Sequence, residues 1–350
     1  MGDAHNQNMS VLANSNPSKN HSIADITVLV VTYNSDPLKA LMTIESIIMQ
    51  EGCRIQIIIA DDGSEETNFK LIKDILDRKF SGSYILLSSD RNHGTVGNIS
   101  RALPYVNSAF VKPISPGDYL YNSDTLNKIV AVIRTSDFAY CFGRGIHYID
   151  DNEFRILSNR NPVVETPYKG SQVNLAQAKR YQIRYQDWIL GAAIVYKTDD
   201  LSRCIERMHG KISLCEDYSL QMLLADGKSI SFIDEFVVWY ERGSGVSTTG
   251  NSLVSQDFQK HISLFLDLFP EDKDVRKMAG YEQLRKAGGS LFNRFLYDPR
   301  RALFRFWYKI IQSQMPVPSP DTNFYEQVNM NALHDIEHFI SATTGKNGVQ

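Results

Sequence analysis

The stretch ITVLVVTYN, residues 26–34, decides the fold class of this chain. Its apolar and β-branched residues run almost without interruption, which predicts a strand buried on both faces. Apolar residues then recur at the spacing of one helical face, at Leu38, Leu41, Ile44 and Ile48. A buried strand followed closely by such a helix is the repeating unit of an α/β fold.

The same alternation continues along the chain. Further strands are predicted within residues 55–64, 83–89 and 109–115, and helices within residues 65–76 and 94–106. Short links between alternating strands and helices imply a mainly parallel, Rossmann-like sheet flanked by helices. In such sheets ligands bind beyond the carboxyl ends of the strands.

The pattern is weaker after residue 137. Strands are predicted over 138–149, 188–197 and 229–242, a helix over 217–227, and a loop or an edge strand over 163–169. From residue 252 onward the chain is typical of helices, with breaks near Pro270, Pro299 and Pro316. A helical C-terminal extension therefore follows the sheet.

Composition limits the class of protein. The 350 residues are 43% hydrophobic and 22% charged with a net charge of −3, which fits a globular enzyme and argues against a nucleic-acid binder. The four cysteines form no CxxC pair, so we expect reduced thiols in a cytoplasmic protein. No apolar run approaches the about 20 residues of a membrane span. Residues 1–25 are rich in Asn and Ser, lack a signal-peptide pattern and predict a disordered tail.

Carboxylates at strand ends are the main chemical signal. The dinucleotide, P-loop and nucleophile-elbow motifs are all absent from the sequence. Asp61 and Asp62 follow one predicted strand, and Asp118 follows another. Because parallel strands end at one edge of the sheet, we expect these acids to share a crevice that suits a metal ion, a nucleotide or both.

Five motifs together resemble the family 2 glycosyltransferases of the GT-A fold. In chain order they are VVTYN, ADDGS, NHGTVGN, SPGDYL and CEDYSL, between residues 30 and 220. Each is weak alone, but five in the right order are specific, and the resemblance runs from about Ile26 to Trp239. It implies a GT-A catalytic domain over residues 26–250 and a helical region for acceptor or membrane association over residues 251–345.

The resemblance implies a site for a nucleotide-sugar, UDP-linked by preference. Asp62 would accept a hydrogen bond from the uracil ring, because an ionised carboxylate is acceptor-only and the uracil imide is a donor; a plain Asp-Gly turn is the alternative. The same pocket would be lined by Val31, Thr32, Tyr33, Asn34, Asn92, Gly94 and Asn98. Tyr33 either stacks on the nucleotide or packs in the core.

Asp118 is the expected metal ligand. The family usually has DxD or DD where this chain has Ser115-Pro116-Gly117-Asp118, so only the last acid remains. The resemblance implies that Gly117 and Asp118 form the turn that binds a divalent cation, Mn²⁺ or Mg²⁺, which would neutralise charge on the departing diphosphate. The missing acid leaves weak or dispensable metal binding as an alternative, and a simple turn aspartate as another.

Glu216 and Asp217 precede the predicted helix over 217–227. Acids at a helix start also complement the helix dipole, so capping is an alternative to chemistry. The resemblance implies that Asp217 is the general base of an inverting displacement and that Glu216 orients the acceptor or supports Asp217. It also places Gly191 near the donor sugar. Three further candidates have structural alternatives: Trp188 as a sugar platform or a core residue, and Arg242 and Ser247 as diphosphate contacts or parts of a surface loop.

The C-terminal region is basic. Between Arg276 and Gln312 nine Lys or Arg residues face two acids. After the Asp298-Pro299 helix start, Leu303, Phe306, Trp307 and Ile310 share one face, opposite Arg301, Arg305 and Lys309. Such a helix either lies on an anionic membrane or packs its apolar face on the catalytic domain. HDIEH at residues 334–338 fits a zinc-protease pattern but lacks a third ligand, so an exposed helix is preferred.

The sequence therefore predicts an inverting hexosyltransferase that uses a UDP-sugar. Its acceptor would be a glycan or a lipid-linked oligosaccharide, in bacterial surface polysaccharide synthesis (capsule or O-antigen), in the cytoplasm or on the inner membrane face. The alternative is a catalytically silent, glycosyltransferase-like subunit that binds a nucleotide or a partner. Retention of Asp217 argues against that alternative. A homo-oligomer is compatible with the sequence, and a nucleic-acid partner is not expected.

Overall fold

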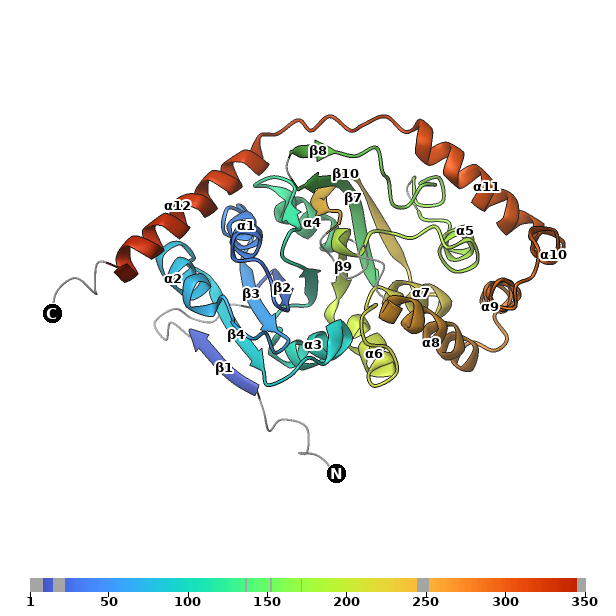
Figure 1. The fold of residues 1–350 in the computed structure, drawn as a ribbon, viewed down its shortest axis with the longest axis horizontal. Helices are drawn as coiled ribbons and strands as arrows, with labels where there is room; N and C mark the ends of the chain where they lie inside the picture. Colours follow the sequence, from blue (N-terminus) through green and yellow to red (C-terminus); the bar gives the residue numbers. More distant parts are fainter. Residues whose placement is uncertain are drawn as a thin grey trace, which may run out of the picture.

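A computed structural model describes residues 9–14, 23–135, 137–151, 153–170, 172–243 and 252–344. Its strands form one central sheet that helices cover on both faces (Figure 1). The strands are β1 (Met9–Asn14), β2 (Ile26–Thr32), β3 (Ile55–Asp61), β4 (Ser83–Ser89), β5 (Phe110–Ile114), β6 (Tyr119–Leu120), β7 (Tyr140–Asp150), β8 (Phe154–Ile156), β9 (Ile194–Lys197) and β10 (Ile230–Glu241).

Twelve α-helices lie in the described part of the chain. They are α1 (Pro37–Ile48), α2 (Phe69–Lys79), α3 (Gly94–Ala102), α4 (Thr125–Ile133), α5 (Leu175–Lys179), α6 (Thr198–Met208), α7 (Tyr218–Ala225), α8 (Ser252–Leu268), α9 (Lys273–Lys286), α10 (Leu291–Tyr297), α11 (Pro299–Gln314) and α12 (Phe324–Thr344). Short turns η1 (Leu103–Tyr105), η2 (Arg180–Tyr185) and η3 (Gly191–Ala193) complete the set.

One sheet organises the molecule, in the order β1-β4-β3-β2-β5-β9-β7-β10-β6, with β8 paired to β7. Strands β4, β3, β2 and β5 are mutually parallel, as the alternating sequence pattern predicts. Strand β9 pairs antiparallel with both β5 and β7, which joins this half to the parallel pair β7 and β10. The α/β, GT-A-like architecture is thus confirmed, with antiparallel strands added at the centre and the edge.

The core lies on both faces of the sheet because the central strands are apolar on both sides. Every residue of β2 and β3 is buried. One set of their side chains packs with α1, α2 and α4, and the alternate set packs with α3, α6 and α7. The carboxyl ends of the parallel strands are therefore held rigidly at one edge.

Two sequence expectations differ from the structure. The predicted disordered tail over residues 1–25 contains the strand β1. This strand pairs antiparallel with β4, with Met9 opposite Ser89. It covers backbone hydrogen-bonding groups of β4 that would otherwise be unpaired at the sheet edge. The predicted strand over 188–197 is shorter, because residues 191–193 form the turn η3 and only β9 pairs with neighbours.

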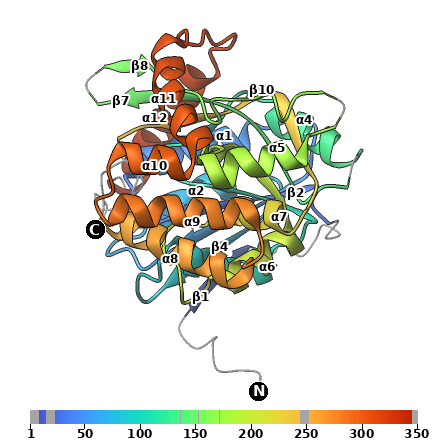
Figure 2. The ribbon, with the colours of Figure 1, turned by 90° about the vertical axis from the view of Figure 1, so that its right-hand side faces the viewer.

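The C-terminal helices separate into two groups. Helices α8 to α11 lie along one side of the sheet, and α12 lies on the other side beside α1 and α2 (Figure 1). Figure 2 looks onto the side formed by α9, α10 and α11. Asp335 of α12 is buried and pairs with Lys79 and Arg78, which fixes α12 to the domain. Among the described helices, none combines the length and apolarity needed to cross a membrane.

Candidate active site

A cavity of about 2460 Å³ lies at the carboxyl ends of β2, β3 and β5. It brings together the predicted residues Val31, Thr32, Tyr33, Asn34, Asp62, Asn92, Gly94, Asn98, Asp118, Trp188, Gly191, Glu216, Asp217 and Arg242. Gly117 lies behind this wall rather than in it, and Ser247 lies outside the described residues. One cavity therefore collects acids that follow β3 and β5 or precede α7.

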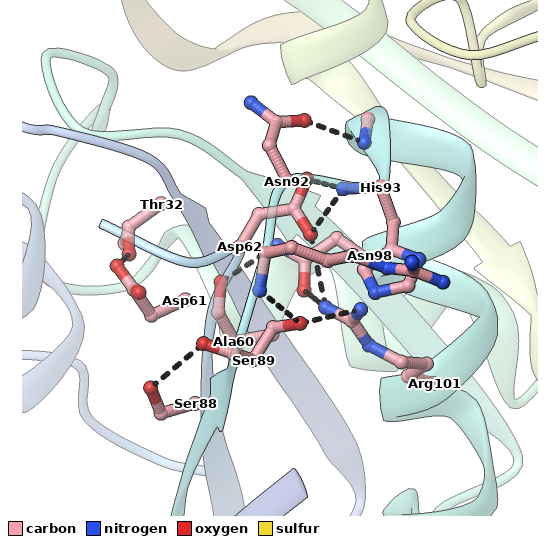
Figure 3. A network of polar contacts seen from close by, with 12 residues as sticks. Thr32, Ala60, Asp61, Asp62, Ser88, Ser89, Asn92, His93, Asn98 and Arg101 are labelled. Atoms are coloured by element: carbon pink, nitrogen blue, oxygen red, sulfur yellow. Dashed lines mark hydrogen bonds and ion pairs between the residues drawn. The ribbon is translucent and has the colours of Figure 1, made fainter. Parts of the chain in front are cut away.

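The two aspartates after β3 have different partners, as Figure 3 shows. Asp61 accepts hydrogen bonds from Thr32 Oγ1 and the Ser64 N–H, both at 2.9 Å, so it fixes the turn. Asp62 lines the cavity, and its carboxylate accepts the His93 N–H at 3.0 Å and Arg101 Nη2 at 2.9 Å. Asp62 is thus the member of the pair that faces the cavity.

Arg101 is a neighbour of the site that sequence reasoning missed. It pairs with Asp62 and also donates to Asn98 Oδ1 at 3.3 Å (Figure 3). Asn98 in turn donates to the Ala60 carbonyl at 2.8 Å. The available signal was the spacing of one helical turn in α3, which places Asn98 and Arg101 on the same face.

Tyr33 and Gly94 both line the pocket, Tyr33 with an exposed side chain and Gly94 with a backbone conformation that favours glycine. The Tyr33 side chain is 48% exposed, so core packing is not its role. Gly94 has a φ of +77°, and a Cβ there would lie 2.5 Å from the Ser213 carbonyl oxygen, so only glycine fits. Asn92 Oδ1 accepts the Gly94 N–H at 2.8 Å and caps this turn.

The turn that carries Asp118 is fixed from two sides. Gly117 has a φ of +97°, and its carbonyl accepts the Tyr148 hydroxyl at 2.5 Å. Thr43 of α1 donates to the Asp118 carbonyl at 2.9 Å. Burial raises the pKa of Asp118 to about 8, and the Glu241 charge adds to the rise, while the hydrogen bond from the Glu241 N–H and the Lys112 charge oppose it. The turn therefore aims one buried carboxyl group at the cavity wall.

The residues present fit a divalent cation only if a bound ligand supplies most of its oxygen ligands. Asp118 is the one acid of its turn, and the Glu241 carboxylate beside it is already paired with Lys39. No group of three or more His, Cys, Asp or Glu side chains suited to a metal occurs in the part of the chain that the structure describes. The donor set thus fits a cation that takes most of its oxygen ligands from a bound diphosphate.

Glu216 and Asp217 lie in the turn before α7. Asp217 occupies the cap position of α7, and its side chain makes no capping hydrogen bond to the helix. A Cβ on Gly191 would lie 3.5 Å from the Asp217 Cβ, at ordinary van der Waals contact, so η3 lies beside this acid. Burial raises the pKa of both carboxyl groups, and the charges of Asp217 and Asp118 raise that of Glu216 further. Both carboxyl groups therefore hold their protons to a higher pH than exposed acids do.

Helices α10 and α11 form the outer wall of the cavity. The predicted apolar face of α11 is exposed at Leu303, Phe306 and Trp307, which excludes packing of that face on the catalytic domain. Arg301, predicted to lie on the exposed basic face, is instead buried and paired with Glu282. His334 and His338 are exposed on α12, as expected for an ordinary helix.

Comparisons with known proteins agree with this geometry. Residues 27–193 match the model of the family described as Glycosyl transferase family 2. The fold resembles that of Staphylococcus aureus TarS 1-349 in complex with UDP-GlcNAc, at 16% identity and a TM-score of 0.54, covering 91% of this chain and 92% of that one.

A second solved structure has the same fold. The mannosyltransferase PcManGT from Pyrobaculum calidifontis, in complex with GDP-Man and Mn²⁺, matches at 12% identity and a TM-score of 0.51, covering 92% of this chain and 87% of that one. No curated protein matches the sequence significantly. Residues 27–193 thus match glycosyl transferase family 2, and the chain has the fold of these GT-A glycosyltransferases.

Proposed function

We propose that the protein transfers a hexose from a UDP-sugar to a glycan hydroxyl with inversion at the anomeric carbon. The observation that carries this proposal is the convergence of Asp62, Asp118 and Asp217 in one cavity. These acids match three separate needs of the reaction: base recognition, diphosphate neutralisation and proton removal.

Asp62 is the proposed uracil contact. Its carboxylate is held in place by the His93 N–H and Arg101, so its orientation is set before the nucleotide binds. Thr32, Tyr33 and Asn34 line the wall next to it. The UDP-GlcNAc complex of a similarly folded protein supports UDP as the nucleotide, and the GDP-Man complex of another makes GDP the competitor to test.

Asp217 is the proposed general base. The acceptor oxygen attacks the anomeric carbon, its proton passes to the Asp217 carboxylate, and the bond from carbon to the diphosphate oxygen breaks with its electron pair leaving on UDP. One displacement of this kind inverts the anomeric configuration. A divalent cation held by Asp118 and the diphosphate oxygens would neutralise the leaving charge. Glu216, which lines the same cavity, would hydrogen-bond the acceptor.

A lipid-linked acceptor on an anionic membrane surface is the proposed setting. Large apolar side chains are exposed on α10 and α11, at Leu291, Phe292, Phe295, Leu296, Leu303, Phe306, Trp307 and Ile311. Arg300, Arg305 and Lys309 are exposed among them. Because the same helices wall the cavity, a bilayer contact there would bring a lipid-linked glycan to Asp217. The class of pathway that fits is assembly of a bacterial surface polysaccharide.

Turnover with a panel of nucleotide-sugars tests the proposal. The purified protein is incubated with UDP- and GDP-sugars and glycan acceptors, and the anomeric configuration of the product is read by NMR. Transfer from a UDP-sugar with inversion is expected. Retention of configuration would refute Asp217 as the base of a single displacement, and nucleotide binding without any turnover would favour a silent binding subunit.

A further inference from the structure

The contact between Lys39 and Glu241 lies in the cavity wall, and the proposed function makes no use of it. Lys39 belongs to the first turn of α1, and Glu241 is the last residue of β10. Lys39 Nζ donates to Glu241 Oε1 at 2.5 Å. Their side chains are 30% and 5% exposed, so the lysine reaches solvent while the glutamate is buried beneath it. Both residues line the cavity.

The Glu241 carboxylate occupies the space above the turn that carries Asp118. A Cβ built on Gly117 would lie 2.4 Å from Glu241 Oε2, so any side chain at position 117 would collide with this carboxylate. The Glu241 N–H also donates to Asp118 Oδ1 at 3.3 Å. The Glu241 carboxylate from β10 therefore occupies the space that a side chain at position 117 would fill. It also holds the Lys39 ammonium group in the same wall of the cavity.

Lys39 retains hydrogen-bonding capacity for a ligand. An ammonium group has three donors, and the bond to Glu241 uses one. That bond also restrains the four-carbon stem, which reduces the entropy lost when the ammonium group contacts a ligand. Lys112, whose charge lowers the pKa of Asp118, is fully buried and donates to the Ala192 carbonyl, and it does not line the cavity.

We propose that Lys39, held in place by Glu241, binds the diphosphate of the donor nucleotide. The inference rests on the proposed function only in requiring a nucleoside diphosphate donor. The Lys39 ammonium group would supply positive charge where the departing diphosphate gains negative charge. Its contribution adds to that of any cation at Asp118, so part of the affinity for the diphosphate persists without metal.

Calorimetric titration of the full chain with uridine and UDP, and with guanosine and GDP, tests this role. EDTA is present so that no metal contributes. Lys39→Met is expected to weaken UDP binding by about tenfold or more, as loss of a charged hydrogen bond does, while uridine affinity stays within about twofold. Lys39→Arg should recover part of the loss. Lys79→Met is the matched control, because Lys79 is 29% exposed and pairs with buried Glu45 outside the cavity.

The outcomes separate the two proposals. Equal weakening of a nucleoside diphosphate and its nucleoside by Lys39→Met, or no weakening of either UDP or GDP, would overturn the diphosphate contact even if UDP binds well. A Lys39 effect seen for GDP but not for UDP would uphold the contact and overturn the UDP donor. Absence of binding by any nucleoside diphosphate to the wild-type protein would overturn both.

Discussion

Asp61 and Asp62 are adjacent in the sequence, but their carboxylates have different surroundings. Asp61 is bonded to Thr32 and Ser64 and stabilises the turn, whereas Asp62 faces the cavity beside Arg101. The difference follows from strand geometry, because successive side chains at a strand end point in opposite directions. Substitutions at this scale therefore have distinct expected effects.

Asp62→Asn should weaken UDP binding by about tenfold, because a charged acceptor facing the uracil imide becomes a neutral amide. The measurement is calorimetric titration with UDP. Thermal unfolding of the variant serves as the control, since loss of the Arg101 ion pair also affects the fold. Unchanged affinity in a stable variant would place the uracil contact elsewhere.

Asp217→Asn should lower kcat by about 10²–10⁴ and leave UDP affinity nearly intact, because only proton removal is lost. Steady-state transfer assays and UDP titration give the two quantities. Asp226→Asn, at the other end of α7 and paired with Arg207, is the matched control and should keep full activity. A variant at position 217 with substantial transfer would rule out this acid as the base.

At the scale of elements, α10 and α11 have an apolar surface without a protein partner among the described residues. Leu296 and Leu303 are 63% and 49% exposed and do not line the cavity. Patches of this kind mark sites of association rather than ordinary surface. The two leucines therefore allow a test of membrane contact that leaves the active site untouched.

Leu296→Glu combined with Leu303→Glu should reduce co-sedimentation with vesicles rich in phosphatidylglycerol by about tenfold or more, because charge is placed in an apolar contact. Salt should weaken binding of the wild-type protein. Leu333→Glu on α12 is the control, as Leu333 is 45% exposed on a helix without Lys or Arg. Equal vesicle binding by all three proteins would argue against this surface, and a loss of dimer in light scattering would assign it to a second copy.

At the scale of the whole molecule, buried histidines link stability to pH. His261 is fully buried, accepts or donates one hydrogen bond with Gln221 at 2.9 Å and stacks on Tyr218, which follows Asp217. Burial lowers the pKa of His261 to about 3 and that of His147 to about 4, against 6.5 for the unfolded chain. The unfolded state therefore binds protons first as the pH falls below 6.5.

The free energy of unfolding should fall by about 2 kcal/mol per buried histidine between pH 6.5 and pH 5, since each pH unit in this window is worth about 1.4 kcal/mol. Urea unfolding at both pH values measures it. His261→Phe should remove about half of the summed loss from the two buried histidines. His334→Gln, at an exposed position, should leave that loss unchanged. An identical pH slope in His261→Phe would show that other groups dominate.

Local sequence determined the parallel half of the sheet, the strand-end acids and the position of most helices. These features depend on short-range properties: apolar runs, helical spacing, and turns set by proline and glycine. Even so, the pattern missed β1, because pairing with β4 rather than its own composition places residues 9–14 in the sheet. It also assigned Arg301 to solvent, because the partner Glu282 lies on another helix.

Only the tertiary structure decided which distant residues meet at the site. Arg101 reaches Asp62 across 39 positions, and Lys39 reaches Glu241 across 202. No local sequence pattern encodes such contacts, since they depend on how the helices pack on the sheet and on which strands become neighbours. The sequence by itself thus determined the fold class and the acids available for chemistry, whereas packing decided how those acids are paired, buried and held toward the cavity.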